Sequence, residues 1–162
     1  MSALSHRAAF ARVVPLLLLA LCASGCSLTR WIDRCFGGDV KMNVSVADDL
    51  NNNSPVAVEV LFLYDEGQLE ALSKQSAQDW FKNRDQFVKD NANKPPGFDH
   101  WKWEWVPGQA VPVIPLSYRI GARGGVIFVS YASAGTHRAV IDVRSNIQLS
   151  LGTREFTVVQ TR

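Results

Sequence analysis

The chain has 162 residues, of which 17 are Lys or Arg and 15 are Asp or Glu, and its formal net charge is +2 at pH 7. The first 25 residues hold two of the basic residues, Arg7 and Arg12, and no acidic one, so the chain from residue 26 onward is neutral. A neutral chain without a basic cluster gives no indication of a nucleic-acid partner, and its length suits one domain with its own hydrophobic core.

Residues 1–25 have the pattern of an export signal. Basic residues precede an apolar run over 13–23, and the small residues Ala23-Ser24-Gly25 stand directly before Cys26. This order is typical of a secretory signal peptide, and the run is too short to cross the ~30 Å hydrocarbon layer of a bilayer as a helix. A cysteine at this point matches the bacterial lipobox, in which the cysteine becomes the acylated N-terminus. The sequence therefore predicts a lipoprotein, and cleavage that releases a soluble periplasmic protein is the alternative.

Residues 26–39 are expected to form a lipidated tether that ends at Gly37-Gly38. Several acyl chains on Cys26 would anchor the chain durably, at ~0.8 kcal/mol per buried CH₂. Ser27 follows the cysteine, and by similarity to lipoprotein sorting signals it implies the outer membrane. Cys22 leaves with the signal, so if Cys26 is acylated Cys35 has no partner for a disulfide within the chain.

From residue 40 to 162, short apolar stretches with a period of two predict a β domain. Strands are expected over 40–46, 56–64, 101–105, 111–120, 125–132, 137–143, 147–151 and 155–160. The stretch 56–64 is apolar on both faces except for Glu59 and should be a central strand, as should 125–132, whereas Pro112 and Pro115 favour a sheet edge. Seven to eight strands at this spacing predict a mainly-β fold, a β-sandwich.

Residues 66–93 interrupt the strands with a helical period. Ser76, followed three residues later by Asp79, resembles a capping box, and aromatic side chains at a spacing of three to four, beginning with Trp80, form a stripe on one helical face. Pro95-Pro96 ends the segment. The sequence thus predicts a helical insertion after the second strand.

Candidates for catalysis or metal binding are few. His100 and His137 are the histidines that remain after residue 25, and neither has a second histidine at HxH or HxxxH spacing, so no metal site is expected. Ser130, His137 and Asp142 could form a hydrolase triad only if the fold brings them together, and the chain has no G-x-S-x-G nucleophile elbow. We therefore expect solvated turn histidines and no enzymatic activity.

Residues 101–105, Trp-Lys-Trp-Glu-Trp, place three indole rings on one face of a strand. An exposed indole face would suit stacking against a sugar ring, as in a periplasmic sugar-binding module. A buried face would cover a hydrophobic core. We expect the buried arrangement, with the helix that bears Trp80 and Phe81 seated on the indoles.

The polar loop 47–55 between the first two strands is the candidate binding surface, and it is long for a hairpin connection. The residues expected to contact a partner are Asp48, Asp49, Leu50, Asn51, Asn52 and Asn53. A leucine among hydrogen-bonding side chains is a composition suited to docking another protein, and loops presented by a rigid sheet are common binding sites. A merely solvated turn is the alternative.

Several short motifs follow one another in a distinctive order. They are the lipobox, an Asn-rich loop ending in Ser54-Pro55-Val56, the patch Asp79-Trp80-Phe81, the turn Pro107-Gly108-Gln109 and the strand from Gly125 to Tyr131. This order resembles the TssJ (SciN) family, the outer-membrane lipoproteins of the type VI secretion system. The resemblance covers nearly all of the chain after Cys26.

The resemblance implies a transthyretin-like β-sandwich with an added helical element. It implies a structural role at the periplasmic face of the outer membrane, where the protein would anchor the type VI secretion membrane complex. It also implies that the loop 48–53 contacts the periplasmic part of the inner-membrane protein TssM, and that no cofactor is needed beyond the covalent lipid on Cys26. A secretin pilotin or another envelope-assembly lipoprotein is the alternative, as is an envelope hydrolase or a sugar-binding module.

Overall fold

The computed structural model describes residues 37–161. The export signal, Cys26 and Cys35 lie outside the described residues, so the expectations for them stay predictions. In chain order the elements are β1 (Gly38–Val46), η1 (Leu50–Asn52), β2 (Val56–Leu63), α3 (Glu66–Lys74), α4 (Ala77–Asn91), β3 (Phe98–Trp105), β4 (Ile114–Tyr118), β5 (Gly124–Val129), β6 (Arg138–Ile141), β7 (Asn146–Leu151) and β8 (Phe156–Thr161). The first strand begins slightly earlier than the predicted boundary at residue 40.

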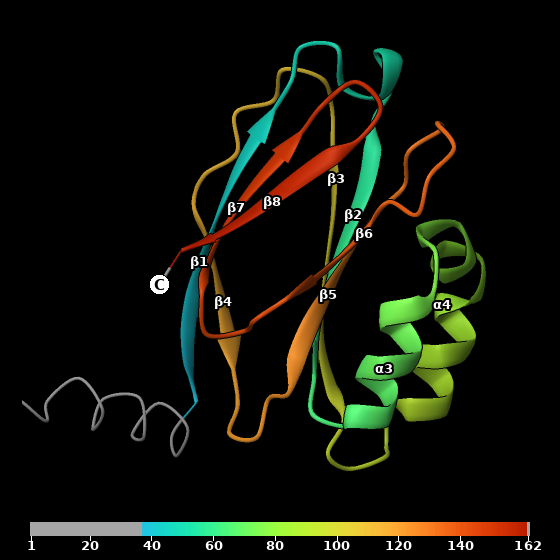
Figure 1. Ribbon diagram of the computed structural model, residues 1–162, viewed down its shortest axis with the longest axis vertical. Helices are drawn as coiled ribbons and strands as arrows, with labels where there is room; N and C mark the ends of the chain where they lie inside the picture. Colours follow the sequence, from blue (N-terminus) through green and yellow to red (C-terminus); the bar gives the residue numbers. More distant parts are fainter. Residues whose placement is uncertain (1–36, 162) are drawn as a thin grey trace, which may run out of the picture. The chain divides into compact units, whose positions relative to one another are not determined.

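The strands form two four-stranded sheets with a shared core between them (Figure 1). The first sheet has the order β4-β1-β7-β8, and the second has the order β3-β2-β5-β6. All neighbouring pairs are antiparallel except β1 and β7, which run parallel. The helices α3 and α4 cover the outer face of the second sheet. The predicted mainly-β sandwich with a helical insertion after the second strand is thus confirmed.

Apart from Glu59, β2 is apolar on both faces because a different layer covers each face. Val60 and Phe62 face the core between the sheets, while Leu61 and Leu63 face the helices. β2 and β5 are the central strands of the second sheet, as their apolar runs predicted. β4 contains Pro115 and lies at the edge of the first sheet, as the prolines predicted.

The helical insertion consists of two capped helices. The Asp65 side chain accepts a hydrogen bond from the N–H of Gln68 at the start of α3. The Ser76 hydroxyl accepts one from the N–H of Asp79 at the start of α4, which is the predicted capping arrangement.

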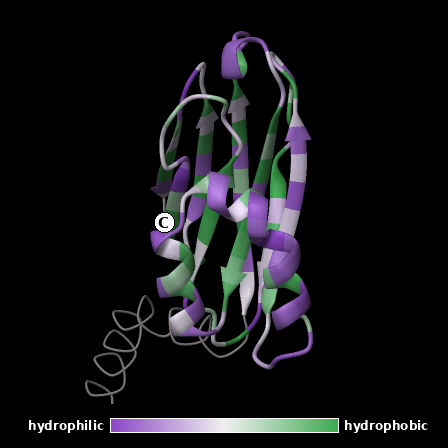
Figure 2. Cartoon of the chain, turned by 90° about the vertical axis from the view of Figure 1, so that its right-hand side faces the viewer, coloured by the Kyte–Doolittle hydropathy of each residue, from purple (hydrophilic) through white to green (hydrophobic). Residues whose placement is uncertain are grey.

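Both helices bury an apolar side against the second sheet and present polar residues outward, as Figure 2 shows. Leu72, Ala77 and Trp80 pack over Val126 and Phe128 of β5. In the part of the chain that the structure describes, no helix is long and apolar enough to cross a bilayer.

β1 places the start of the domain and the candidate loop at opposite ends. The chain joins β1 at Gly38 and leaves it at Val46, directly before the loop 47–55. The nine residues of this strand, at about 3.3 Å each, separate the two points by ~30 Å. In Figure 1 the start of β1 lies at the bottom and the loop lies at the top.

The Trp-rich strand β3 confirms one expectation and corrects another. Trp105 is buried, and Trp101 and Trp103 are half-buried against the core between the sheets, so the indoles do cover a core. The prediction that they seat the helix bearing Trp80 is wrong, because the alternate residues of β3 face the helices. Trp80 stacks instead on Phe128 of β5, with ring centroids 5.1 Å apart.

His100 is also misplaced by the sequence prediction. β3 begins at Phe98, earlier than expected, and this puts His100 within the strand on the side of the helices. Its side chain is 9% exposed, and its Nε2 lies 2.8 Å from Oε2 of Glu59. The expectation of a solvated turn histidine is therefore wrong for His100.

Candidate binding surface

The loop 47–55 has a left-handed backbone that its asparagines accommodate. Asn51, Asn52 and Asn53 have φ angles of 46°, 53° and 62°. Asparagine adopts this conformation more readily than other residues with a side chain, because its short amide can hydrogen-bond locally. The run of asparagines therefore has a conformational cause, which is the turn that takes the chain from one sheet to the other.

Leu50 and Asn51 anchor the loop from inside. Leu50 is fully buried in the core between the sheets. Asn51 is 6% exposed, and its Nδ2 donates to the carbonyl of Pro55 at 3.2 Å while its Oδ1 accepts from the N–H of Ala132 at 2.9 Å. In this conformation neither side chain offers a surface to a partner.

The exposed side chains of the loop form a smaller surface than the sequence suggested, which we call the polar loop face. It consists of Asp48, Asp49, Asn52 and Asn53. Two carboxylates and two carboxamides thus lie together at the end of the domain away from Gly38.

Two neighbouring loops hold the polar loop face in place. Gly108 donates its backbone N–H to the carbonyl of Ala47 at 3.0 Å, and the hydroxyl of Thr153 donates to Asp49 at 2.6 Å. A Cβ at residue 108 would lie 2.9 Å from Oδ1 of Asp48, and the φ of Gly108 is +68°, so glycine is needed there. The Pro-Gly-Gln turn therefore shapes the loop.

Tyr131 links the end of β5 to the turn between β7 and β8. Its hydroxyl lies 3.0 Å from the carbonyl oxygens of both Gly152 and Glu155 and donates to them. Burial, together with the charge of Glu155, raises the pKa of Tyr131 to about 12. The phenol is therefore neutral, and a donor, across the physiological range.

The fold does not assemble the triad considered from the sequence. The Ser130 hydroxyl accepts from the N–H of Ala57 at 2.8 Å, and Nε2 of His137 lies 2.8 Å from the carbonyl of Ser133. The Asp142 carboxylate accepts a backbone N–H two residues along the chain, at 3.0 Å. These hydrogen bonds join each side chain to a different partner.

Within residues 37–161, no group of three or more His, Cys, Asp or Glu side chains could hold a metal ion.

The most concentrated polar chemistry lies beneath α4, and the sequence analysis missed it. Glu59, in β2, is 1% exposed and accepts a hydrogen bond from Nε1 of Trp80 at 2.8 Å. It also pairs with Arg84 of α4 and with His100 of β3. Burial alone would raise the pKa of Glu59, but the hydrogen bonds from His100 and Trp80 and the nearby positive charges outweigh it, so the pKa is lowered. A single acid in an otherwise apolar strand was the signal that could have revealed a buried partner.

Comparison with known proteins identifies the fold. No protein-family model and no curated protein matches the sequence. The T6SS lipoprotein TssJ1 from Pseudomonas aeruginosa matches with a TM-score of 0.56 and 17% identity, over 78% of this chain and 98% of that chain. Serratia marcescens Lip, a membrane bound component of the Type VI Secretion System, matches with a TM-score of 0.59 and 12% identity, over 78% and 99%. A chain of the structure described as T6SS protein TssM C-terminal domain (869-1107) from EAEC matches with a TM-score of 0.56 and 11% identity, over 75% and 98%. The chain therefore has the fold of the TssJ lipoproteins.

Proposed function

We propose that the chain is a structural lipoprotein that anchors a type VI secretion membrane complex to the outer membrane by binding the periplasmic part of a TssM-type inner-membrane protein. The observation that carries the proposal is the fold shared with TssJ1 and Lip over nearly the whole length of those chains. The lipobox at Cys26 adds the membrane anchor, and the loop between the first two strands adds the binding surface.

The arrangement of the domain suits a protein that stands between a membrane and a periplasmic partner. Residues 27–36 can span at most ~35 Å when fully extended, which keeps the domain near a membrane that holds Cys26. The chain joins the domain at the end away from the loop, so the polar loop face would point away from that membrane.

A polar contact of this size can suffice when both partners are held in the same envelope. Tethering raises the effective concentration of the binding surface, so that a weak contact becomes an efficient one. The carboxylates of Asp48 and Asp49 would accept hydrogen bonds from N–H and O–H groups of the partner, and the amides of Asn52 and Asn53 would both accept and donate.

The packing of β3 removes the basis for the sugar-binding alternative. The indole face that would stack on a sugar covers the core between the sheets, and Trp105 is 3% exposed. The pilotin alternative predicts a secretin as the bound protein, and the following experiment distinguishes it.

The experiment isolates the full-length, C-terminally tagged chain from the solubilised envelope of its host and identifies the bound proteins. The loop-face variant changes Asp48 and Asp49 to Ser and Asn52 and Asn53 to Gly. It keeps Leu50 and Asn51, because replacing the whole of 48–53 would remove a buried core side chain.

A matched control changes exposed residues at the other end of the domain, Lys94→Ser and Ile120→Ser. We expect the control to retain a TssM-type protein and the loop-face variant to lose it. Retention by the loop-face variant would refute the binding surface, and capture of a secretin would favour the pilotin.

A further inference from the structure

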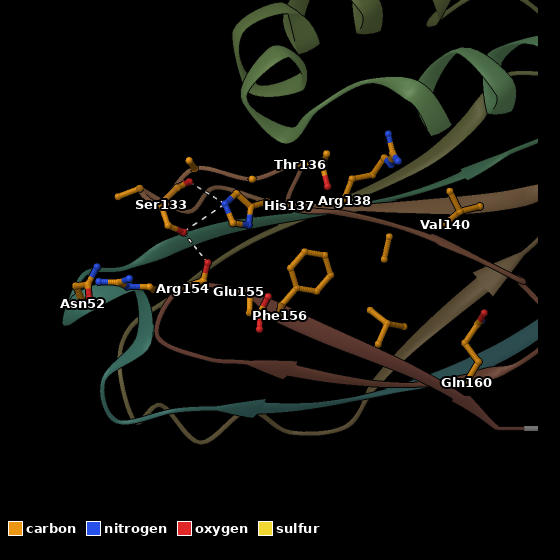
Figure 3. A pocket seen from close by; sticks show the side chains of 15 residues that line it. Asn52, Ser133, Thr136, His137, Arg138, Val140, Arg154, Glu155, Phe156 and Gln160 are labelled. Atoms are coloured by element: carbon orange, nitrogen blue, oxygen red, sulfur yellow. Dashed lines mark hydrogen bonds between the residues drawn. The ribbon is translucent and has the colours of Figure 1, made fainter.

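A groove of about 880 Å³ opens between β6 and β8, which are edge strands of the two sheets (Figure 3). One wall carries Arg138 and Val140, and the other carries Phe156 and Gln160, as the figure shows. Asn52 of the polar loop face also lines the groove, so the two surfaces are continuous.

The open edge of β6 presents backbone hydrogen-bonding groups to this groove. In an antiparallel pair, residues that exchange hydrogen bonds alternate with residues that do not. The N–H of Val129 donates to the carbonyl of His137 at 3.0 Å, and alternation along the register makes Arg138 and Val140 positions that do not bond to β5. Their N–H and C=O groups therefore point away from β5, toward the edge.

The Gln160 side chain already forms hydrogen bonds with this edge, at the backbone of Asp142. Its Nε2 donates to the carbonyl of Asp142 at 2.9 Å, and its Oε1 accepts from the N–H of the same residue at 3.1 Å. Asp142 follows Val140 by two residues, so its backbone groups lie on the same edge. A carboxamide presents one donor and one acceptor side by side, as a peptide group does. The edge of β6 is therefore suited to an amide partner, and it leaves Arg138 and Val140 open to one.

The charged side chains of the groove are mostly basic. The residues that line it include two arginines, Arg138 and Arg154, and a single carboxylate, that of Glu155. Arg138 is fixed by a hydrogen bond from Nη1 to the carbonyl of Gln75 at 3.1 Å, and its Nε has no partner within the described residues. The excess of positive charge favours an acidic side chain in a bound segment.

Beyond the arginines the groove is apolar. Val140 is 52% exposed although its side chain is large and hydrophobic, and Phe156 and Val158 are half-buried on the opposite wall. These side chains could receive the apolar residues of an extended segment.

We propose that β6 takes an added strand from the binding partner. The segment pairs with the backbone of Arg138 and Val140, and its side chains alternate between the two faces of the sheet. On the helix side it places an acidic side chain near Arg138 and an apolar one beside Val140, and on the core side it places apolar side chains against Phe156. In this mode of recognition, main-chain hydrogen bonds give affinity and side-chain pockets give specificity. The inference rests on the proposed function and adds to it the form of the bound segment.

The test compares Val140→Pro with Val140→Ala in the full-length, membrane-anchored chain. Because the N–H of Val140 points into the groove, proline removes a donor for the added strand while the ladder to β5 keeps its donors. Alanine retains the N–H and removes only the apolar contact. In parallel, a photo-crosslinking residue replaces Val140, or Val113 as a control that is similarly exposed outside the groove.

We expect Val140→Pro to lower capture of the inner-membrane partner by about tenfold, the equivalent of one hydrogen bond, and Val140→Ala to lower it less. The crosslink from Val140 should map to a segment of that partner with alternating apolar residues and an acidic residue, and Val113 should give no such crosslink. If Val140→Pro does not fold, as judged by circular dichroism, the crosslink decides.

Unchanged capture by a folded Val140→Pro variant would overturn the inference, as would a crosslink to a second copy of this chain. If the loop-face variant loses the partner while Val140→Pro keeps it, the proposed function stands and the added strand does not. If the wild-type chain captures no inner-membrane protein, both fail.

Discussion

Asn51 combines a left-handed backbone with two buried hydrogen bonds, and it should be the most sensitive polar residue of the loop. Asn51→Ala removes the bonds to Pro55 and Ala132, at about 1 kcal/mol each. An alanine at a φ of 46° adds roughly 1 kcal/mol of strain. We therefore expect Asn51→Ala to lower the free energy of unfolding by about 3 kcal/mol.

Two control variants separate these contributions. Asn51→Gly loses both hydrogen bonds without the strain and should cost about 2 kcal/mol. Asn52→Ala has a similar φ, 53°, at an exposed position, so only the strain of about 1 kcal/mol applies. The measurement is urea unfolding followed by tryptophan fluorescence. If Asn51→Ala is no more destabilising than Asn52→Ala, the buried amide does not hold the loop.

Two further predictions concern the titratable groups. Glu59 has a pKa lowered from 4.5 in the folded state, so its charge stabilises the fold above that pH, and this contribution is lost as the pH falls through the folded pKa. Glu59→Gln should therefore lower the free energy of unfolding by about 3 kcal/mol at neutral pH. On acidification the variant should lose less stability than the wild type. Chemical unfolding at several pH values measures this, and an equal dependence on pH in both proteins would contradict the prediction. For Tyr131, titration followed by near-ultraviolet absorbance should show a phenol ionising at about 12. Tyr131→Phe should lack that step and lose about 1 kcal/mol of stability, and an unchanged titration curve would be the contrary result.

The strands could be predicted because each has a local signature. The period of two in β1, the double-sided apolar run in β2 and the prolines before and within β4 depend only on neighbours in the chain. The same holds for the start of α4, where Ser76 caps the first turn.

The sequence could not show which part of the structure each apolar face of a strand or helix packs against. The indoles of β3 and the aromatic stripe of α4 are both apolar, and either could have packed on the other. Their separation into two cores follows from the alternation of β3, which puts His100 rather than the indoles beneath Trp80. Leu50 was predicted to face a partner because its neighbours in sequence are polar. Its burial depends on the gap between two sheets that no local pattern describes.

If one end of the domain is tied to lipid and the other holds a partner, the two attachments should be separable. Host envelopes containing the wild-type chain, Cys26→Ser or the loop-face variant would be fractionated by density, and the inner-membrane partner followed in each fraction. We expect the wild-type chain to bring the partner into outer-membrane fractions, Cys26→Ser to keep the partner but leave those fractions, and the loop-face variant to remain there alone. A Cys26→Ser chain that stays with the outer membrane, or a loop-face variant that still brings the partner there, would contradict the proposed function.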